Sequence, residues 1–154
     1  MKRSILTIAL AVFTLAAVAQ PGGGPSPKPS QHQSHSNPDT KKITSEIQRM
    51  YRGASIKEIE KERTGYEVEI IHEKRSKEVK FNNSINWVST TYDIRSSELP
   101  PKIQDAIKRS KYGVMRIDDV DVIETPKRNY YEIEFDKLLG GEAKARIDFN
   151  GKFL

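Results

Sequence analysis

The chain has 154 residues, with 26 Lys and Arg against 21 Asp and Glu, so its formal net charge is +5. It contains no cysteine, which excludes a disulfide framework, a thiolate zinc or iron–sulfur site and a cysteine nucleophile. Hydrophobic residues make up 36% and charged residues 31%, which suits one domain built on a sheet with one wet face.

The first segment, residues 1–19, has the layout of a secretory signal peptide. Lys2 and Arg3 precede an apolar run, and Ala17-Val18-Ala19 supplies the small residues that a signal peptidase accepts. The run is short for a membrane span and no stop-transfer pattern follows; an uncleaved anchor is the alternative. We therefore expect export to the periplasm or the extracellular space, with no membrane span after cleavage.

Residues 20–38 are dominated by Pro, Gly, Ser, Gln and His, and we expect them to form a disordered linker. His32 and His35 lie three residues apart in this linker, a spacing that two ligands of one metal ion can have. No third ligand is nearby, so the simpler interpretation is a pair of solvated histidines. We predict no metal site and no cofactor.

The predicted domain, residues 39–154, opens with a short helix. Asp39 and Thr40 are its expected N-cap, and Gly53 is expected to end it. Its apolar residues recur at helical spacing and form one stripe: Ile43, Ile47, Met50 and Tyr51.

Strands are expected to follow, because apolar and charged residues alternate. The first expected strand contains Ile56 and Ile59. In the second, Tyr66, Val68 and Ile70 alternate with Glu67 and Glu69. In the third, Val79 and Phe81 lie on either side of Lys80. Trp87 to Ile94 is a further strand. Turns are expected at Gly65, at residues 72–76 and at residues 82–84.

The same order then recurs. A second helix opens at Leu99-Pro100-Pro101, carries Ile103, Ala106 and Ile107, and is expected to end at Gly113. The strands that follow contain Ile117, Val120 and Val122, then Tyr131, Ile133 and Phe135, then Ala143, Ala145, Ile147 and Phe149. Asn150-Gly151 is a hairpin signal before Phe153. Tyr66–Glu69 aligns with Tyr131–Glu134, and Trp87 aligns with Phe153.

These alignments predict two repeats, residues 39–95 and 96–154. A helix of this length cannot bury its apolar stripe alone, so each helix must lie on the sheet. The expected fold is α+β: two helix-plus-antiparallel-strands repeats, with both helices packed on one face of a curved antiparallel sheet and the other face open to solvent.

The chain resembles the PepSY-like, beta-lactamase-inhibitor-like proteins of the Bacteroidetes envelope. The first copy of the pattern is Tyr51-Arg52-Gly53-Ala54-Ser55-Ile56 with Gly65-Tyr66-Glu67-Val68, and the second is residues 130–135 with Ile147-Asp148-Phe149-Asn150-Gly151. The resemblance covers about residues 40–154. Arg52 stands where the family has proline, and residues 82–86 lack the usual Asp and Gly. The resemblance implies an exported, non-catalytic binding or inhibitory module.

No constellation for catalysis is recognisable. His72 is the one histidine of the predicted domain, and it lies at a strand end with no evident nucleophile, so we predict that the protein is not an enzyme. Asp118-Asp119-x-Asp121 lacks the glycine and distal glutamate of a calcium loop. Basic residues are interleaved with acidic ones along the chain, which argues against nucleic acid as a partner.

Partner-binding residues are expected on the open side of the sheet. The candidates are Trp87, Tyr130, Glu67, Glu69, Glu132, Lys144 and Arg146. Exposed aromatic residues among charges are typical anchors of protein interfaces. Trp87 has a second interpretation, because it aligns with Phe153 and would then belong to the core. The predicted function is binding of a protein or peptide partner, including inhibition of an envelope hydrolase; the alternative is a structural or accessory envelope protein.

Overall fold

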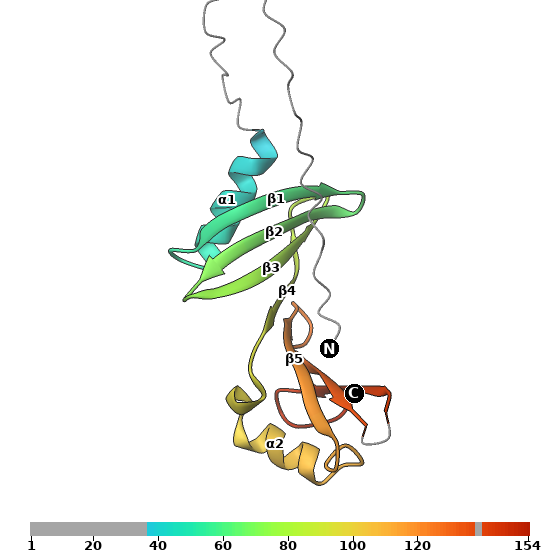
Figure 1. The fold of residues 1–154 in the computed structure, drawn as a ribbon. Helices are drawn as coiled ribbons and strands as arrows, with labels where there is room; N and C mark the ends of the chain where they lie inside the picture. Colours follow the sequence, from blue (N-terminus) through green and yellow to red (C-terminus); the bar gives the residue numbers. More distant parts are fainter. Residues whose placement is uncertain (1–36, 138–139) are drawn as a thin grey trace, which may run out of the picture. The chain divides into compact units, whose positions relative to one another are not determined.

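The structure is a computed structural model that describes residues 37–137 and 140–154 (Figure 1). The predicted signal peptide and residues 20–36 of the predicted linker lie outside these ranges. The elements are α1 (Pro38–Met50), β1 (Ser55–Glu62), β2 (Gly65–His72), β3 (Arg75–Asn82), β4 (Trp87–Asp93), a 3-10 turn η1 (Ser96–Glu98), α2 (Pro101–Lys108), β5 (Arg116–Glu124), β6 (Tyr130–Asp136) and β7 (Glu142–Asp148). Among the described helices, none is long and apolar enough to span a membrane.

All seven strands form one sheet in which each strand pairs with its neighbours in the chain. Every pairing is antiparallel, so the sheet is a meander that does not close, with β1 and β7 as its edges. The prediction of an α+β fold with an antiparallel sheet and two helices is confirmed.

Both helices lie on the same face of the sheet, because cross-strand partners share a face. Thr90 of β4 follows Ile59, Val68 and Val79 in one row across the sheet, and this row packs with α1 in one core cluster. Tyr92, two residues on and therefore on the same face, pairs with Val122 and belongs to the cluster around α2. We call this the helix face. The opposite face carries no helix among the described elements.

The start of α1 differs from the predicted start. The N-cap is Asn37, whose side chain accepts a hydrogen bond from the Asp39 N–H at 3.1 Å, and Pro38 occupies the first turn. Asp39 and Thr40 are therefore inside the helix, and the prediction that they cap it is wrong. Proline suits this first position because its missing N–H would have no partner there in any case. Ile43 and Ile47 are fully buried, as the apolar stripe predicts.

Gly65 does not form the turn predicted for it. It is the first residue of β2, and the hairpin turn lies just before it. A Cβ on Gly65 would stand 1.8 Å from the carbonyl oxygen of Phe81, so no other residue fits without moving the neighbouring strand. Glycine is required here by the close approach of two backbones.

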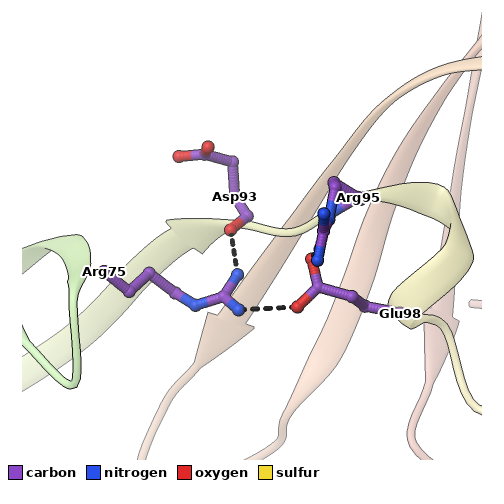
Figure 2. Close-up of polar contacts among 4 residues, drawn as sticks. All are labelled: Arg75, Asp93, Arg95 and Glu98. Carbon is purple, nitrogen blue, oxygen red and sulfur yellow. Dashed lines mark hydrogen bonds and ion pairs between the residues drawn. The ribbon is translucent and has the colours of Figure 1, made fainter.

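A charged cluster holds the connection between β4 and α2 against β3. The Arg75 guanidinium donates to the Asp93 carbonyl oxygen at 2.6 Å and to the Glu98 carboxylate at 2.7 Å (Figure 2). The second Glu98 oxygen accepts from the Arg95 backbone N–H at 2.9 Å, which caps η1. These hydrogen bonds, from Arg95 first and then from Arg75, lower the pKa of Glu98 to about 2.

Glu98→Gln should remove a stabilising contribution that depends on pH. Because the pKa of Glu98 is lowered from 4.5 to about 2 in the folded state, the charged carboxylate stabilises the fold above pH 4.5 and ceases to do so as the pH falls toward 2. Thermal unfolding should therefore show a lower Tm for the variant at pH 7 and a shrinking difference below pH 4.5. A difference that stays constant between pH 7 and pH 2 would contradict the ion-paired role of Glu98.

Tyr131→Ala and Tyr130→Ala should separate the two faces of β6. Tyr131 is 8% exposed and its ring lies 4.8 Å from that of Phe149, so its removal should cost about 3–5 kcal/mol of unfolding free energy. Tyr130 lies on the face without helices, and its removal should cost no more than about 1 kcal/mol. Urea denaturation of both variants measures this, and a larger loss for Tyr130→Ala would reverse the assignment of the two faces.

Candidate protein-interaction face

The face opposite the helices, here called the open face, consists of alternate residues from all seven strands. Cross-strand pairing connects its members in rows, of which Glu60, Glu67 and Lys80 form one. Its charged members are Glu58, Glu60, Glu62, Glu67, Glu69, Glu78, Lys80, Asp93, Arg116, Asp119, Asp121, Glu132, Glu134, Asp136, Glu142, Lys144, Arg146 and Asp148. Ile123 and Tyr130 lie opposite each other within it.

The open face is strongly acidic although the chain as a whole is basic. It carries 14 acidic and 4 basic side chains, a balance of −10. The other described residues carry the remaining 7 acidic and 19 basic side chains, a balance of +12. Charges that are interleaved along the chain are thus separated in space, because successive strand residues point to opposite faces.

Several carboxylates of the open face lie directly opposite one another. Glu58, Glu69 and Glu78 occupy consecutive positions of one row across β1, β2 and β3. The Glu58 carboxylate, ahead of the other contributions, raises the pKa of Glu60, its neighbour on the same edge strand. Like charges that face each other destabilise a sheet, so this arrangement is not explained by stability.

A second acidic row runs through β4, β5 and β6, where Asp93, Asp121 and Glu132 lie side by side. Burial raises the pKa of Asp121 to about 6, with further contributions from Asp119 and Asp93. No hydrogen bond or ion pair joins the Asp121 carboxylate to another described residue. It is a half-buried acid without a counter-ion at the centre of the sheet.

The basic residues of the open face are paired with acids. Lys144 contacts Glu134 at 2.5 Å and Arg146 contacts Glu132 at 2.5 Å. The Arg146 guanidinium also lies 5.6 Å from the centre of the Tyr130 ring. Such exposed pairs contribute little to stability, but they hold these five side chains in a defined cluster on β6 and β7.

Six of the seven predicted binding residues lie on the open face, in two separate groups. Tyr130, Glu132, Lys144 and Arg146 are gathered on β6 and β7. Glu67 and Glu69 lie on β2, where Lys80 contacts Glu67 at 3.2 Å. The structure therefore brings the first four together and leaves the glutamates of β2 in a different part of the same face.

Trp87 is not on the open face, and the alternative interpretation, in which it belongs to the core, agrees with the structure. Trp87 lies opposite Phe81, packs against the core cluster beneath α1, and donates from its indole N–H to Thr90 at 3.0 Å. A β-bulge in the pairing of β3 with β4 inserts one extra residue between Trp87 and Ser89. The side chains of these two residues therefore point to opposite faces of the sheet. Val88, the residue next to Trp87, is 45% exposed for the same reason.

Sequence reasoning missed the acids that dominate the open face. Glu58, Glu60 and Glu62 alternate along β1, which was a readable signal of one acidic strand face. In the sequence, Asp119 and Asp121 were considered only as part of the calcium-like run with Asp118. In the structure, Asp118 lies at a bulge and is separated from the other two. What the sequence alone does not show is that these strands share one face.

His72 and the carboxylates form no metal-binding group in the described part of the chain. In residues 37–137 and 140–154, no three His, Asp or Glu side chains are placed to hold a metal ion. The His72 ring meets the edge of Tyr51 at 5.5 Å between centroids, and its Nδ1 atom is buried without a hydrogen-bond partner in those ranges. His32 and His35 lie outside the described residues.

Asp121→Asn should stabilise the protein at neutral pH. The raised pKa of about 6 means that the charged form is disfavoured in the folded state above pH 6, and that this penalty disappears as the pH falls below 3.8. Allowing for solvent screening of a half-exposed group, we expect a gain of about 1 kcal/mol at pH 7 by urea denaturation. A variant that is less stable than the parent at pH 7 would show that Asp121 has a stabilising partner.

Comparisons with known proteins agree on one relationship. A family model described as "Putative beta-lactamase-inhibitor-like, PepSY-like" matches residues 38–76 and 70–154. A BLIP-like protein from Bacteroides fragilis superposes with a TM-score of 0.67 at 25% identity, covering 74% of this chain and 82% of that one. A DUF2874 family protein from Bacteroides ovatus gives 0.64 at 22% identity, with coverages of 73% and 82%.

A third solved structure, a "putative periplasmic" protein from Bacteroides eggerthii, gives a TM-score of 0.62 at 17% identity, with coverages of 73% and 83%. No curated protein matches the chain.

Proposed function

Because the chain belongs to the PepSY-like, beta-lactamase-inhibitor-like family, we propose that it is an exported, non-catalytic module that binds a protein partner through its open face. Its membership confirms the resemblance found in the sequence. Inhibition of an envelope hydrolase is the form of binding that the family description suggests for it. The signal-like segment 1–19 supports export.

One observation carries this proposal: a charge of −10 on the open face of a chain whose other described residues carry +12. Carboxylates that face one another destabilise the free protein, and a basic partner surface would relieve that repulsion. The partner we propose is therefore a protein with a basic surface, anchored at Tyr130. Complementary charge would also accelerate its encounter with the open face.

We propose further that the domain is an internal duplication. In support, β1 and β5 each carry a bulge one residue after their first core isoleucine, between Ile56 and Glu58 and between Ile117 and Asp119. Each helix packs over the strands that follow it, in a core cluster of its own. The proposed boundaries are 1–19 for the signal peptide, 20–38 for the linker, and 39–95 and 96–154 for the repeats.

A second candidate function is supported by the same charge separation. The acidic open face of one copy is complementary to the basic surface of another, which would give head-to-tail self-association and a structural or accessory role in the envelope. Light scattering at low and at physiological salt distinguishes the two candidates. Self-association that weakens with salt favours this second function, whereas a monomer at low salt favours a foreign partner.

Site-specific photo-crosslinking in the envelope tests the proposed binding face. With a photoreactive phenylalanine in place of Tyr130, we expect cross-links to one protein with a basic surface. The matched control carries the same group at Phe149, an aromatic that is 41% exposed and lies against the ring of Tyr131 on the helix face. Equal yields from both positions would contradict binding through the open face.

Removing unpaired carboxylates should then abolish the cross-link. The variant Glu60→Gln, Glu69→Gln, Asp119→Asn, Asp121→Asn takes four negative charges from the open face and leaves its ion pairs in place. We expect at least a tenfold loss of cross-link yield. The control variant Lys41→Gln, Lys102→Gln, Arg109→Gln, Lys127→Gln takes four charges from elsewhere and should retain the cross-link.

A further inference from the structure

The outer side of the edge strand β7 is only partly covered. The end of the chain folds back on it, so that Phe153 bridges Ile147 and the Leu154 N–H donates to the Arg146 carbonyl oxygen at 3.0 Å. Apart from that bond to the Arg146 carbonyl, no backbone group of residues 37–137 or 140–154 pairs with the outer side of residues 142–146. The strand therefore has an open edge over residues 142–146.

The backbone groups that point out of this edge can be assigned. The carbonyl of Arg146 and the N–H of Asp148 both bond to the returning chain, so even-numbered residues of β7 present their polar groups outward. Lys144 and Glu142 must therefore do the same. The Lys144 carbonyl oxygen is reached at 3.4 Å by the Tyr112 hydroxyl, a long contact compared with an ordinary backbone hydrogen bond.

A pocket of about 580 Å³ lies beside this open edge. Its walls include the rings of Tyr112 and Phe153 and the methyl group of Ala145. Ala143 and Ala145 point to the helix face, where their small side chains leave room beside the second core cluster. Lys144 points to the opposite, open face, and Lys111 also lines the pocket.

In the other half of the sheet, a strand occupies the corresponding position. There the outer side of β3 is covered by β4, with Thr90 opposite Val79 and Thr91 opposite Glu78. Under the duplication proposed above, Val79 corresponds to Ala145 and Glu78 to Lys144. Among the described residues, no strand fills beside β7 the place that β4 fills beside β3.

We propose that β7 binds an extended segment of a partner chain as an eighth, antiparallel strand with the pattern apolar–acidic–apolar. The first apolar residue lies opposite Ala145 and enters the pocket, the second lies opposite Ala143, and the acidic residue between them lies opposite Lys144. Backbone hydrogen bonds to an exposed sheet edge provide affinity in this mode of binding, and alternate side chains provide specificity. The binding site is the outer edge of β7, whose Lys144 belongs to the open face and also contacts Glu134, and the proposal does not depend on the basic partner.

The opposite edge of the sheet is protected against such pairing. β1 carries a bulge at Lys57, and a bulge in an edge strand hinders the addition of a further strand. The pairing of β6 with β7 is regular over its whole length, so β7 has no such bulge.

Nuclear magnetic resonance of the ¹⁵N-labelled exported protein tests this assignment. The probe is the peptide Val-Glu-Val-Thr-Ser-amide, added to millimolar concentration; it begins opposite Ala145 because Leu154 and Phe153 already lie opposite Arg146 and Ile147. We expect shifts and slowed amide exchange at Lys144 and Glu142, and none along β1. The control peptide has lysine in place of glutamate and should bind at least tenfold more weakly. An absence of changes in β7 with the glutamate peptide would overturn the proposal.

Backbone methylation separates strand addition from simple insertion into the pocket. The residue opposite Lys144 directs its N–H toward β7, whereas its two neighbours direct theirs away. N-methylation of the peptide glutamate should therefore abolish binding, and N-methylation of the second valine should leave the affinity within about threefold. Equal effects of the two methyl groups would overturn the proposed pairing.

Charge reversal in the protein completes the test. Lys144→Glu should weaken binding of the glutamate peptide at least tenfold and restore binding of the lysine peptide. Lys80→Glu, the same change on β3, should alter the binding of neither peptide. If the protein without peptide self-associates, and Lys144→Glu abolishes that association, the edge is occupied by a second copy and the assignment to a foreign segment is wrong.

Discussion

The alternation of side chains along a β-strand is the constraint on which the rest of this structure depends. Successive residues point to opposite faces, so a strand such as Tyr66 to Ile70 places its apolar residues toward the helices and its glutamates away from them. Pairing in regular antiparallel register extends this separation across seven strands. One face then buries Ile43 and Ile47 of α1, and the other collects carboxylates.

This constraint also explains why the charged face is maintained at a cost. The apolar residues must face the helices, because the stripes of α1 and α2 have no other large apolar surface among the described elements. The residues between them must then share the open face, and so Glu58, Glu69 and Glu78 stand in one row. Neutral polar residues would satisfy the fold equally well, and this is the basis for proposing a basic partner.

Bulges are the places where the structure departs from simple alternation, and each has a consequence. The bulge between β3 and β4 turns Trp87 toward the core and Val88 to the surface. The bulge in β5 moves Asp118 out of line with Asp119 and Asp121, and there it contacts Arg116. The bulge in the edge strand β1 leaves β7 as the regular edge, which is the basis for proposing strand addition there.

Local chemistry by itself determines much of this protein. The apolar spacing of Ile43 and Ile47, and the alternation in Tyr131, Ile133 and Phe135, specify two helices, most of the strands and the buried side of each strand. Such patterns repeat over three to four residues or over two, and neighbouring residues decide them. The helix ends are less well defined by the sequence: α2 ends at Lys108, before the predicted end at Gly113, and the cap at Asn37 precedes the predicted cap at Asp39.

Only the tertiary structure decided which charges meet. Sequence order shows Lys and Glu mixed along the chain, and pairing across strands is what placed Asp93 beside Asp121 and Arg146 beside Glu132. The face to which Trp87 points could not be decided from the sequence for the same reason, because a bulge is defined by the register of two paired strands and not by one strand. The acidic face and the open edge of β7 are properties of the assembled sheet, and non-local register is what creates them.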